Sequence, residues 1–247
     1  MQALIPEDKD RRIQFAEWVL HSIEDDNRFL TTLMFSDEAI FHLDGRINKQ
    51  NSRVWSSENP RSYREQPLHS EKVVVWAALS HRGVTGPFFF NGNVTGETYL
   101  AMLKNFLWPQ LINLSEINDL RFMHDGAPPH FALPVRQWLD EVFPSRWIGR
   151  RGPTEWPARS PDLTPLDFYL WGHLKQVVYA RRPRTIENLK DFIRDAVTEV
   201  NNKPGLMHKV LLGLHKDRMR LVVENGGSHI EHLEDSITSD VSNSDDN

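Results

Sequence analysis

The chain has 247 residues, a net charge of −5, 39% hydrophobic and 26% charged residues, which suits a globular protein with a substantial core. It contains no cysteine, which excludes disulfides and thiolate metal sites and agrees with an intracellular location. Its longest apolar run, Val73–Leu79, is too short to cross a bilayer, and the N-terminus lacks a signal-peptide pattern.

The N-terminal region predicts a helix followed by a strand. Residues 8–23 carry apolar side chains at helical spacing, at positions 13, 15, 16, 19, 20 and 23. In residues 31–43 (TTLMFSDEAIFHL) polarity alternates instead, so one face of a strand carries Leu33, Phe35, Asp37, Ala39, Phe41 and Leu43. Asp37 is the only charged member of this face, and its burial costs several kcal/mol unless a partner or a metal ion compensates. Two interpretations fit: a pair with a buried arginine or with backbone amides, or a functional carboxylate.

The next segments predict further strands and a helix. Asp44-Gly45 is a turn signal, and residues 52–55 (SRVW) form a candidate short returning strand. Residues 72–80 (KVVVWAALS) suit a central strand, and Gly86-Pro87 leads into a short run of phenylalanines. Thr95 is a candidate N-cap, with Glu97 in the first turn of a helix that runs to about Leu114.

In the second half, strands and helices alternate before helices take over. Residues 120–125 (LRFMHD) predict a strand, 132–143 a helix and 146–149 (RWIG) a short strand, followed by a loop rich in proline and arginine. Thr164-Pro165 opens a helix through about Tyr179, and two more helices are predicted near 185–201 and 205–224. This order predicts a mixed sheet flanked by helices.

Charge is unevenly distributed along the chain. From Glu224 onward there are seven acidic residues and no lysine or arginine, so removing these seven charges from the net −5 leaves +2 for residues 1–223. The segment after Gly226-Gly227 is predicted to be an acidic disordered tail. Basic clusters lie in residues 146–159 and 175–190, and such clusters are either solvated faces or phosphate-binding surfaces.

Two more aspartates occupy positions where a functional and a structural interpretation compete. Asp125 ends a predicted strand, where ligand sites of α/β sheets gather, but an aspartate before Gly126 is also a common turn former. Asp167 lies three residues after Thr164, which is the spacing of a capping box. His124 and His130, which flank Asp125, are interpreted as local hydrogen-bonding residues rather than metal ligands.

Three motifs carry a resemblance to a known family: FSDEAIFHL, MHDGAPPH and SPDLTPLDFYLWG, in this order. Together they resemble the three acidic motifs of the mariner-like transposases of the Tc/mariner superfamily. The resemblance covers roughly residues 29–179 and continues more weakly to about His232. It implies an RNase H-like α/β fold, a mixed five-stranded sheet flanked by helices, with a C-terminal helical extension.

The resemblance also implies the site. The family's metal-binding acidic residues correspond to Asp37, Asp125 and Asp167, so these are the expected catalytic residues and ligands of two Mg²⁺ or Mn²⁺ ions. For the third position Asp167 is preferred to Asp162, because family members carry Asp or Glu where Asp167 stands, whereas Asp162 belongs to the surrounding S-P-D-L turn. Arg150, Arg151 and Arg159 are the expected phosphate contacts. Trp147 and Trp156 are candidates for base stacking, with packing as the alternative.

Two departures from the family pattern qualify the resemblance. Asp125 and Asp167 are 42 positions apart, longer than in the best-known mariners, and the extra length lies in SRWIGRRGPTEWPAR. The paired helix-turn-helix region of the family is also missing before residue 29. The expected organisation is therefore a linker helix (1–28), an RNase H-like catalytic domain (29–182), C-terminal helices (183–225) and an acidic tail (226–247).

Three functions compete at this point. The first is a transposase-derived DNA endonuclease and strand-transfer domain, with DNA as partner, a homodimer on DNA, a nuclear location, and neither a membrane nor a small-molecule cofactor. The second is a catalytically silent fragment or recruited domain that binds DNA or a partner through its basic faces. The third is an RNase H-like nuclease that acts on RNA–DNA hybrids.

Overall fold

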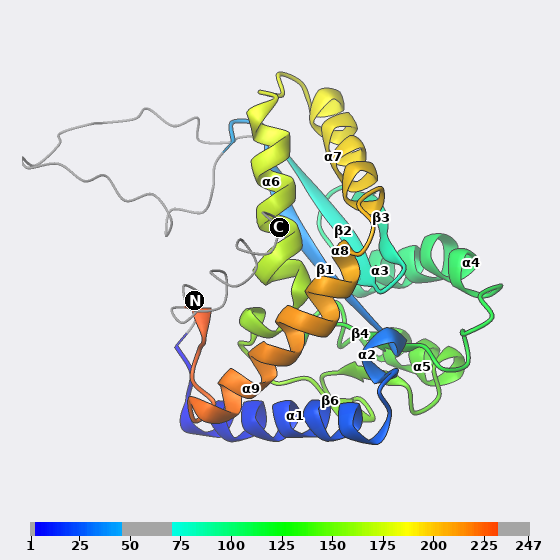
Figure 1. The fold of residues 1–247 in the computed structure, drawn as a ribbon. Helices are drawn as coiled ribbons and strands as arrows, with labels where there is room; N and C mark the ends of the chain where they lie inside the picture. The colour runs from blue at the N-terminus through cyan, green and yellow to red at the C-terminus, as the bar shows by residue number, and fades with distance from the viewer. Residues whose placement is uncertain (1–2, 46–70, 232–247) are drawn as a thin grey trace, which may run out of the picture.

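A single mixed sheet organises the chain. The computed structural model describes residues 3–45 and 71–231, and in them six strands pair in the order β3-β2-β1-β4-β5-β6 (Figure 1). The antiparallel half contains β3, β2 and β1, and the parallel half runs from β1 through β4 and β5 to β6. The strands are β1 (Leu33–His42), β2 (Lys72–Ser80), β3 (Gly83–Phe90), β4 (Arg121–Met123), β5 (Trp147–Gly149) and β6 (Thr154–Glu155).

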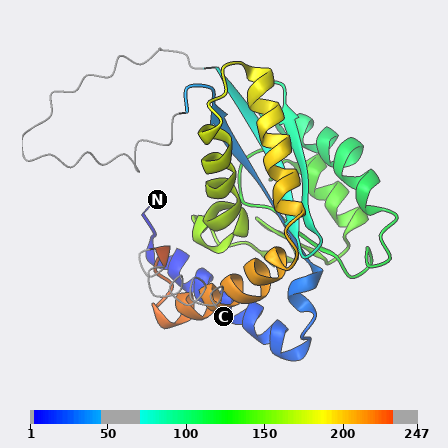
Figure 2. The same cartoon turned by 45° about the horizontal axis from the view of Figure 1, so that its top comes forward.

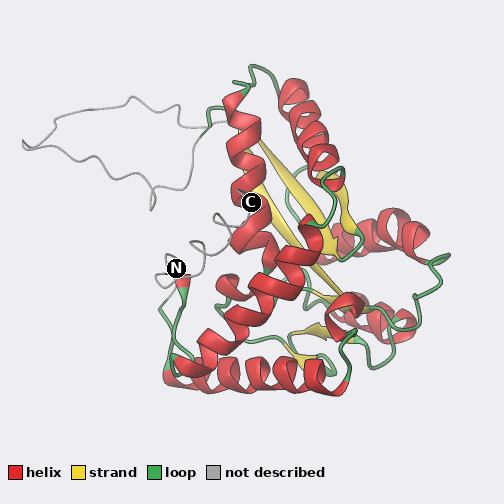
Figure 3. Ribbon diagram, in the orientation of Figure 1, coloured by secondary structure: helices red, strands yellow, loops and turns green. Residues whose placement is uncertain are grey.

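Helices cover both faces of the sheet, and each face has its own core (Figure 3). One face packs against α1 (Pro6–Asp25), α6 (Trp171–Ala180), α7 (Ile186–Asn201) and α9 (Lys216–Glu224). The other packs against α3 (Gly96–Met102), α4 (Trp108–Leu111) and α5 (Leu133–Val142). The described residues also form the short helices α2 (Phe29–Thr32) and α8 (Leu206–His208), a 3-10 helix at Pro161–Leu163, and π-helical segments at 103–107, 166–170 and 209–215. Figure 2 shows α1 and α9 packed together although they lie at opposite ends of the sequence.

The central strand β1 follows the predicted alternation. Leu33, Phe35, Ala39 and Phe41 are buried in the core under α6, whereas Met34 faces the opposite core. Asp37 lies on the first of these faces, opposite Ala77 of β2. The pleat therefore places a carboxylate on an apolar face at the middle of the sheet.

Most predicted elements are present, and the fold class is confirmed. The strand expected at 52–55 lies outside the described residues. The sheet has six strands rather than five because Thr154–Glu155 pairs with β5 inside the segment predicted as loop. Residues 226–231 also differ from the expected disordered tail: Ile230 is buried, and its backbone N–H donates to Asp162 Oδ2 at 3.1 Å. Among the described residues, no helix has the length and apolar character required to cross a bilayer.

A buried histidine gives the fold a pH dependence. His215 is fully buried, and its ring lies 4.9 Å from that of Phe35. Burial, assisted by the positive charge of Arg218, lowers the pKa of His215 to about 3. The unfolded chain therefore takes up a proton below its ordinary pKa of about 6.5 that the folded chain excludes.

The contribution of His215 to stability is complete above pH 6.5 and is lost progressively as the pH falls toward 3. At pH 5 this cost is about 2 kcal/mol. When the pH is lowered from 7.5 to 5, the free energy of unfolding of His215→Leu is therefore expected to fall by about 2 kcal/mol less than that of the parent. Urea unfolding at the two pH values measures this difference. His21→Leu, at an exposed position, is the control and should follow the parent. Parallel pH profiles for His215→Leu and the parent would contradict this account.

Candidate active site

Asp37 has a specific partner on the neighbouring helix. The indole Nε1–H of Trp171 donates to Asp37 Oδ2 at 2.8 Å, which leaves Oδ1 without a hydrogen-bond partner among the described residues. Trp171 is the first residue of α6, one helical turn after Asp167. The polar partner that the sequence requires for Asp37 is therefore an indole rather than an arginine.

Asp125 follows β4 and is held by two donors. Its Oδ1 accepts from the backbone N–H of Ala127 at 2.9 Å and lies 2.6 Å from His130 Nδ1. The other ring nitrogen of His130 lies 3.2 Å from Glu38 Oε1, so this buried imidazole bridges two carboxylates. Both donors address the same oxygen of Asp125. His130 thus has the local hydrogen-bonding role expected from the sequence.

Asp167 lies at the start of the π-helical segment 166–170 that leads into α6. It does not form the capping box that its spacing from Thr164 suggested, because the backbone N–H of Thr164 donates to Pro161 O at 3.2 Å. Asp167 is exposed, and among the described residues its carboxylate accepts no hydrogen bond. Its side chain is therefore available to a ligand.

The three aspartates line one cavity of about 310 Å³. They reach it from a strand, a strand end and a helix start that are distant in the sequence. The remaining walls come from β1, the end of β4 and the loop before the third aspartate: Ser36, Met123, Gly126, Trp156, Ala158, Arg159, Ser160, Pro161 and Thr164.

The carboxylates influence one another electrostatically. Burial and the charges of Asp167 and Glu38 raise the pKa of Asp37 well above its usual range. Desolvation and the charge of Asp125 raise the pKa of Asp167 to about 7. Desolvation also acts to raise the pKa of Asp125, but the hydrogen bond and charge of His130 outweigh it and lower the pKa. The cavity thus concentrates negative charge.

Two cations lie beside this charge. Burial lowers the pKa of His130, but the charges and hydrogen bonds of Glu38 and Asp125 more than reverse this and raise it to about 10. Lys175, one turn beyond Trp171 on α6, lies with Nζ 5.6 Å from the ring centre of Phe41. Burial lowers the pKa of Lys175, against the opposing charges of Asp167 and Asp37.

In this conformation the described residues contain no group of three or more His, Cys, Asp or Glu side chains close enough to hold one metal ion. Repulsion between like charges favours this separation. The chemistry of the donors nevertheless suits a hard divalent cation, because all three side chains offer carboxylate oxygen to the same cavity.

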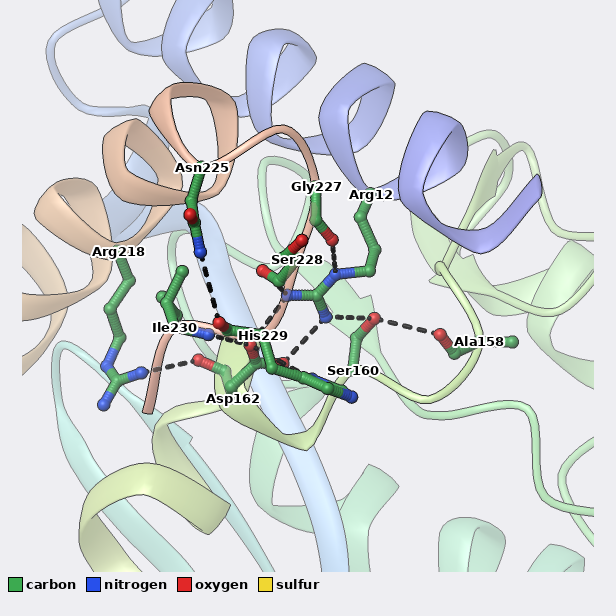
Figure 4. A network of polar contacts seen from close by, with 10 residues as sticks. All are labelled: Arg12, Ala158, Ser160, Asp162, Arg218, Asn225, Gly227, Ser228, His229 and Ile230. Atoms are coloured by element: carbon green, nitrogen blue, oxygen red, sulfur yellow. Dashed lines mark hydrogen bonds and ion pairs between the residues drawn. The ribbon is translucent and has the colours of Figure 1, made fainter. Parts of the chain in front are cut away.

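Asp162, the alternative third carboxylate, has a structural partner (Figure 4). Its Oδ1 and Oδ2 each lie 2.7 Å from a guanidinium nitrogen of Arg12, and both side chains are fully buried. Desolvation acts to raise the pKa of Asp162, but the hydrogen bonds and charge of Arg12 outweigh it and lower the pKa. The structure therefore separates the two aspartates of this motif: Asp167 faces the cavity, and Asp162 faces Arg12.

The predicted phosphate contacts fall into two groups. Arg150 and Arg151 are exposed, and their guanidinium carbons lie 4.6 and 5.4 Å from the ring centre of Phe131. Arg159 also lines the cavity, but its Nε donates to Asp8 Oδ2 at 2.6 Å. Trp147 and Trp156 are buried, which favours the packing alternative for both.

Trp171 and Arg12 were not predicted from the sequence as site residues, and Lys175 was recognised only as a member of the basic cluster at 175–190. Trp171 and Lys175 follow Asp167 at successive four-residue intervals, a helical periodicity that identifies one face once Asp167 is chosen. Arg12 carries no such signal, because 150 positions separate it from Asp162.

Comparison with known proteins agrees with the fold. No protein-family profile matches the chain. It is 27% identical over 202 residues to the Tc3 transposase of Caenorhabditis elegans, covering 81% of this chain and 58% of the relative, and 24% identical over 190 residues to the Tcb2 transposase of Caenorhabditis briggsae, covering 76% and 66%. The chain thus spans under two thirds of the length of either relative.

Solved structures of a mariner transposase share this fold. The catalytic domain of Mos1 mariner transposase superposes with a TM-score of 0.69 at 19% identity, covering 93% of this chain and 98% of that one. The Mos1 mariner paired-end complex with Mn gives 0.72 at 20% identity, covering 92% and 65%. The chain is therefore similar in sequence to the Tc3 and Tcb2 transposases, and it has the RNase H-like fold of the Mos1 mariner catalytic domain.

Proposed function

We propose that this chain is a transposase-derived DNA endonuclease and strand-transfer domain that uses two divalent metal ions bound by Asp37, Asp125 and Asp167. One observation carries the proposal: three carboxylates from separate parts of the sequence line a single cavity. The raised pKa values of Asp37 and Asp167 fit a site in which a bound cation offsets the repulsion between the carboxylates.

Mg²⁺ and Mn²⁺ suit this donor set, because both prefer oxygen ligands. The Mos1 mariner paired-end complex was solved with Mn, which supports the use of a divalent ion in this fold. When bound, two such ions activate the attacking oxygen and stabilise the charge that develops on the phosphate and the leaving oxygen.

The residues of the chain have distinct tasks in this proposal. Trp171 holds one oxygen of Asp37, so the other oxygen can bind a ligand. His130 and the Ala127 N–H do the same for Asp125. Asp167 has no such partner among the described residues, so it has the greatest freedom to adjust to a ligand. Lys175 offsets part of the negative charge from the side of α6.

DNA is the proposed substrate, acted on in the nucleus by a homodimer. The solved paired-end and strand-transfer complexes of Mos1 support this assembly.

Metal-dependent cleavage of DNA tests the proposal. The purified chain is expected to nick or cut DNA with Mg²⁺ or Mn²⁺, and Asp125→Asn should reduce the rate at least about 100-fold because a metal ligand is lost. The matched control is Asp119→Asn, which changes an exposed aspartate at the opposite end of β4 and should keep parental activity.

The other outcomes assign the competing functions. DNA binding without cleavage under any metal condition would contradict the proposal and favour a silent DNA-binding descendant. Faster cleavage of an RNA–DNA hybrid than of a DNA duplex would indicate an RNase H-like nuclease instead.

A further inference from the structure

Three arginines surround one aromatic ring beside the candidate active site. The guanidinium carbons of Arg136, Arg150 and Arg151 lie 4.4, 4.6 and 5.4 Å from the ring centre of Phe131. Arg136 comes from α5, and the other two come from the turn after β5. The contact is reinforced by Arg136 Nε, which donates to Phe131 O at 3.2 Å. We call these four residues the arginine–phenylalanine cluster.

No described carboxylate neutralises the charge of this cluster. Within residues 3–45 and 71–231, none of its three arginines forms an ion pair with a carboxylate, whereas Arg12, Arg159 and Arg181 all do. The face of an aromatic ring attracts a cation, but three neighbouring guanidinium groups also repel one another. A bound anion would offset this repulsion, and guanidinium groups bind phosphate through paired hydrogen bonds.

The position of the cluster indicates which anion. Phe131 directly follows His130, whose ring holds Asp125. Arg150 packs beside Gly126, since a Cβ at Gly126 would lie 3.5 Å from Arg150 Cβ, and Gly126 lines the cavity. An extended phosphodiester strand with one phosphate in the cavity therefore has neighbouring phosphates within reach of the cluster.

We propose that the arginine–phenylalanine cluster binds the backbone phosphates of a nucleic-acid strand next to the phosphate that enters the cavity. This inference rests on the proposed function for the chemistry in the cavity, and it adds a second subsite in which Arg136 and Phe131 take part. Arg159 belongs to a different group, because it is already paired with Asp8. Contacts of this kind position a strand without reading its sequence.

The test measures DNA binding without divalent metal, so it does not depend on cleavage. Duplex affinity is measured by fluorescence anisotropy at 50 and 200 mM salt for the parent and for Arg136→Gln/Arg150→Gln/Arg151→Gln. Each lost phosphate contact reduces the slope of log K against log salt by about 0.9, so losing three makes the affinity ratio between the two salts about 40-fold smaller.

Two further variants and one control distinguish the loss of phosphate contacts from a loss of folding. Arg150→Gln/Arg151→Gln changes exposed residues only and should reduce that ratio about 12-fold. Phe131→Leu keeps every charge but removes the ring, so affinity should fall about two- to five-fold with the salt slope retained. Arg28→Gln removes an exposed charge before β1, at the opposite end of the sheet from Asp125, and should bind as the parent does.

Specific outcomes would overturn the proposal. A parental salt slope in both multiple-arginine variants, with parental melting temperatures, excludes phosphate contact by the cluster. An equal loss in Arg28→Gln shows a general effect of net charge. Inorganic tripolyphosphate is the second probe: binding as tight as that of the DNA, lost in the arginine variants, would assign the cluster to a free phosphate compound. A chain that binds as predicted but never cleaves would refute the proposed activity and leave this inference intact.

Discussion

Arg12→Ala is expected to lower the free energy of unfolding by about 3–5 kcal/mol, because it leaves the Asp162 carboxylate buried without its counter-charge. Arg12 is fully buried, and its guanidinium also donates to Ser160 Oγ and Gly227 O, each at 2.8 Å, and to Ser228 O at 3.2 Å. Alanine replaces none of these donors. Because water cannot replace charged hydrogen bonds in a buried site, nearly their whole contribution to the free energy of unfolding is lost.

Urea unfolding at neutral pH measures this loss, with the surface pair as control. Arg220 is exposed and lies 3.2 Å from Asp217 on the same helix. Arg220→Ala should lower the free energy of unfolding by less than about 0.5 kcal/mol. The double variant Arg12→Met/Asp162→Leu should recover much of the loss, because it removes both buried charges and fills their volume with apolar atoms. A loss below 1 kcal/mol in Arg12→Ala would show that water reaches the pair.

This ion pair explains how the ends of the described chain support the site. Arg12 lies on α1, Asp162 lies in the 3-10 helix before Asp167, and Gly227 belongs to the segment after α9 (Figure 4). The packing is tight, since a Cβ at Gly227 would lie 2.3 Å from Lys9 O. The segment that lines the cavity before Asp167 is therefore held in place by α1 and by the segment after α9, both distant from it in the sequence.

The sheet was predictable because its strands carry local signals. The alternation through β1 and the apolar run of β2 determine which side chains face each core, and the structure follows them. The two-residue strand β6 has no such pattern, since its pairing with β5 depends on tertiary position. Likewise, Ile230 is buried because Gly226 and Gly227 adopt positive φ and turn the chain back onto α1, which composition alone does not reveal.

The candidate site was predictable in its carboxylates and not in their partners. Asp37 required a partner because of its place on an apolar face, but periodicity cannot say whether that partner is an arginine, a metal or the indole of Trp171. The arginines were recognised by charge alone, and charge does not show that Arg159 is paired whereas Arg150 and Arg151 share a ring. Pairing across long sequence separations is decided by the fold.

Asp167→Asn is expected to stabilise the metal-free protein and to remove most of its response to Mn²⁺. The pKa of Asp167 is raised to about 7, chiefly by desolvation and by Asp125. Between the ordinary pKa near 4 and pH 7, the folded chain retains a proton that the unfolded chain has released, so stability falls as the pH rises through this window. Above pH 7 the whole cost is present. Because Asp167 is exposed, solvent screening reduces this cost to about 1–2 kcal/mol.

At pH 8 without metal, Asp167→Asn should therefore be about 1–2 kcal/mol more stable than the parent. Mn²⁺ at 100 times its dissociation constant should stabilise the parent by about 2.7 kcal/mol and the variant by much less. Thermal and urea unfolding with and without Mn²⁺ measure both effects, and Asp119→Asn, at an exposed site outside the cavity, should follow the parent. Equal Mn²⁺ stabilisation of all three proteins would place the ion elsewhere. A less stable metal-free Asp167→Asn would show that this carboxylate is structural, because only a site that keeps its charges together for a ligand gains stability when one of them is removed.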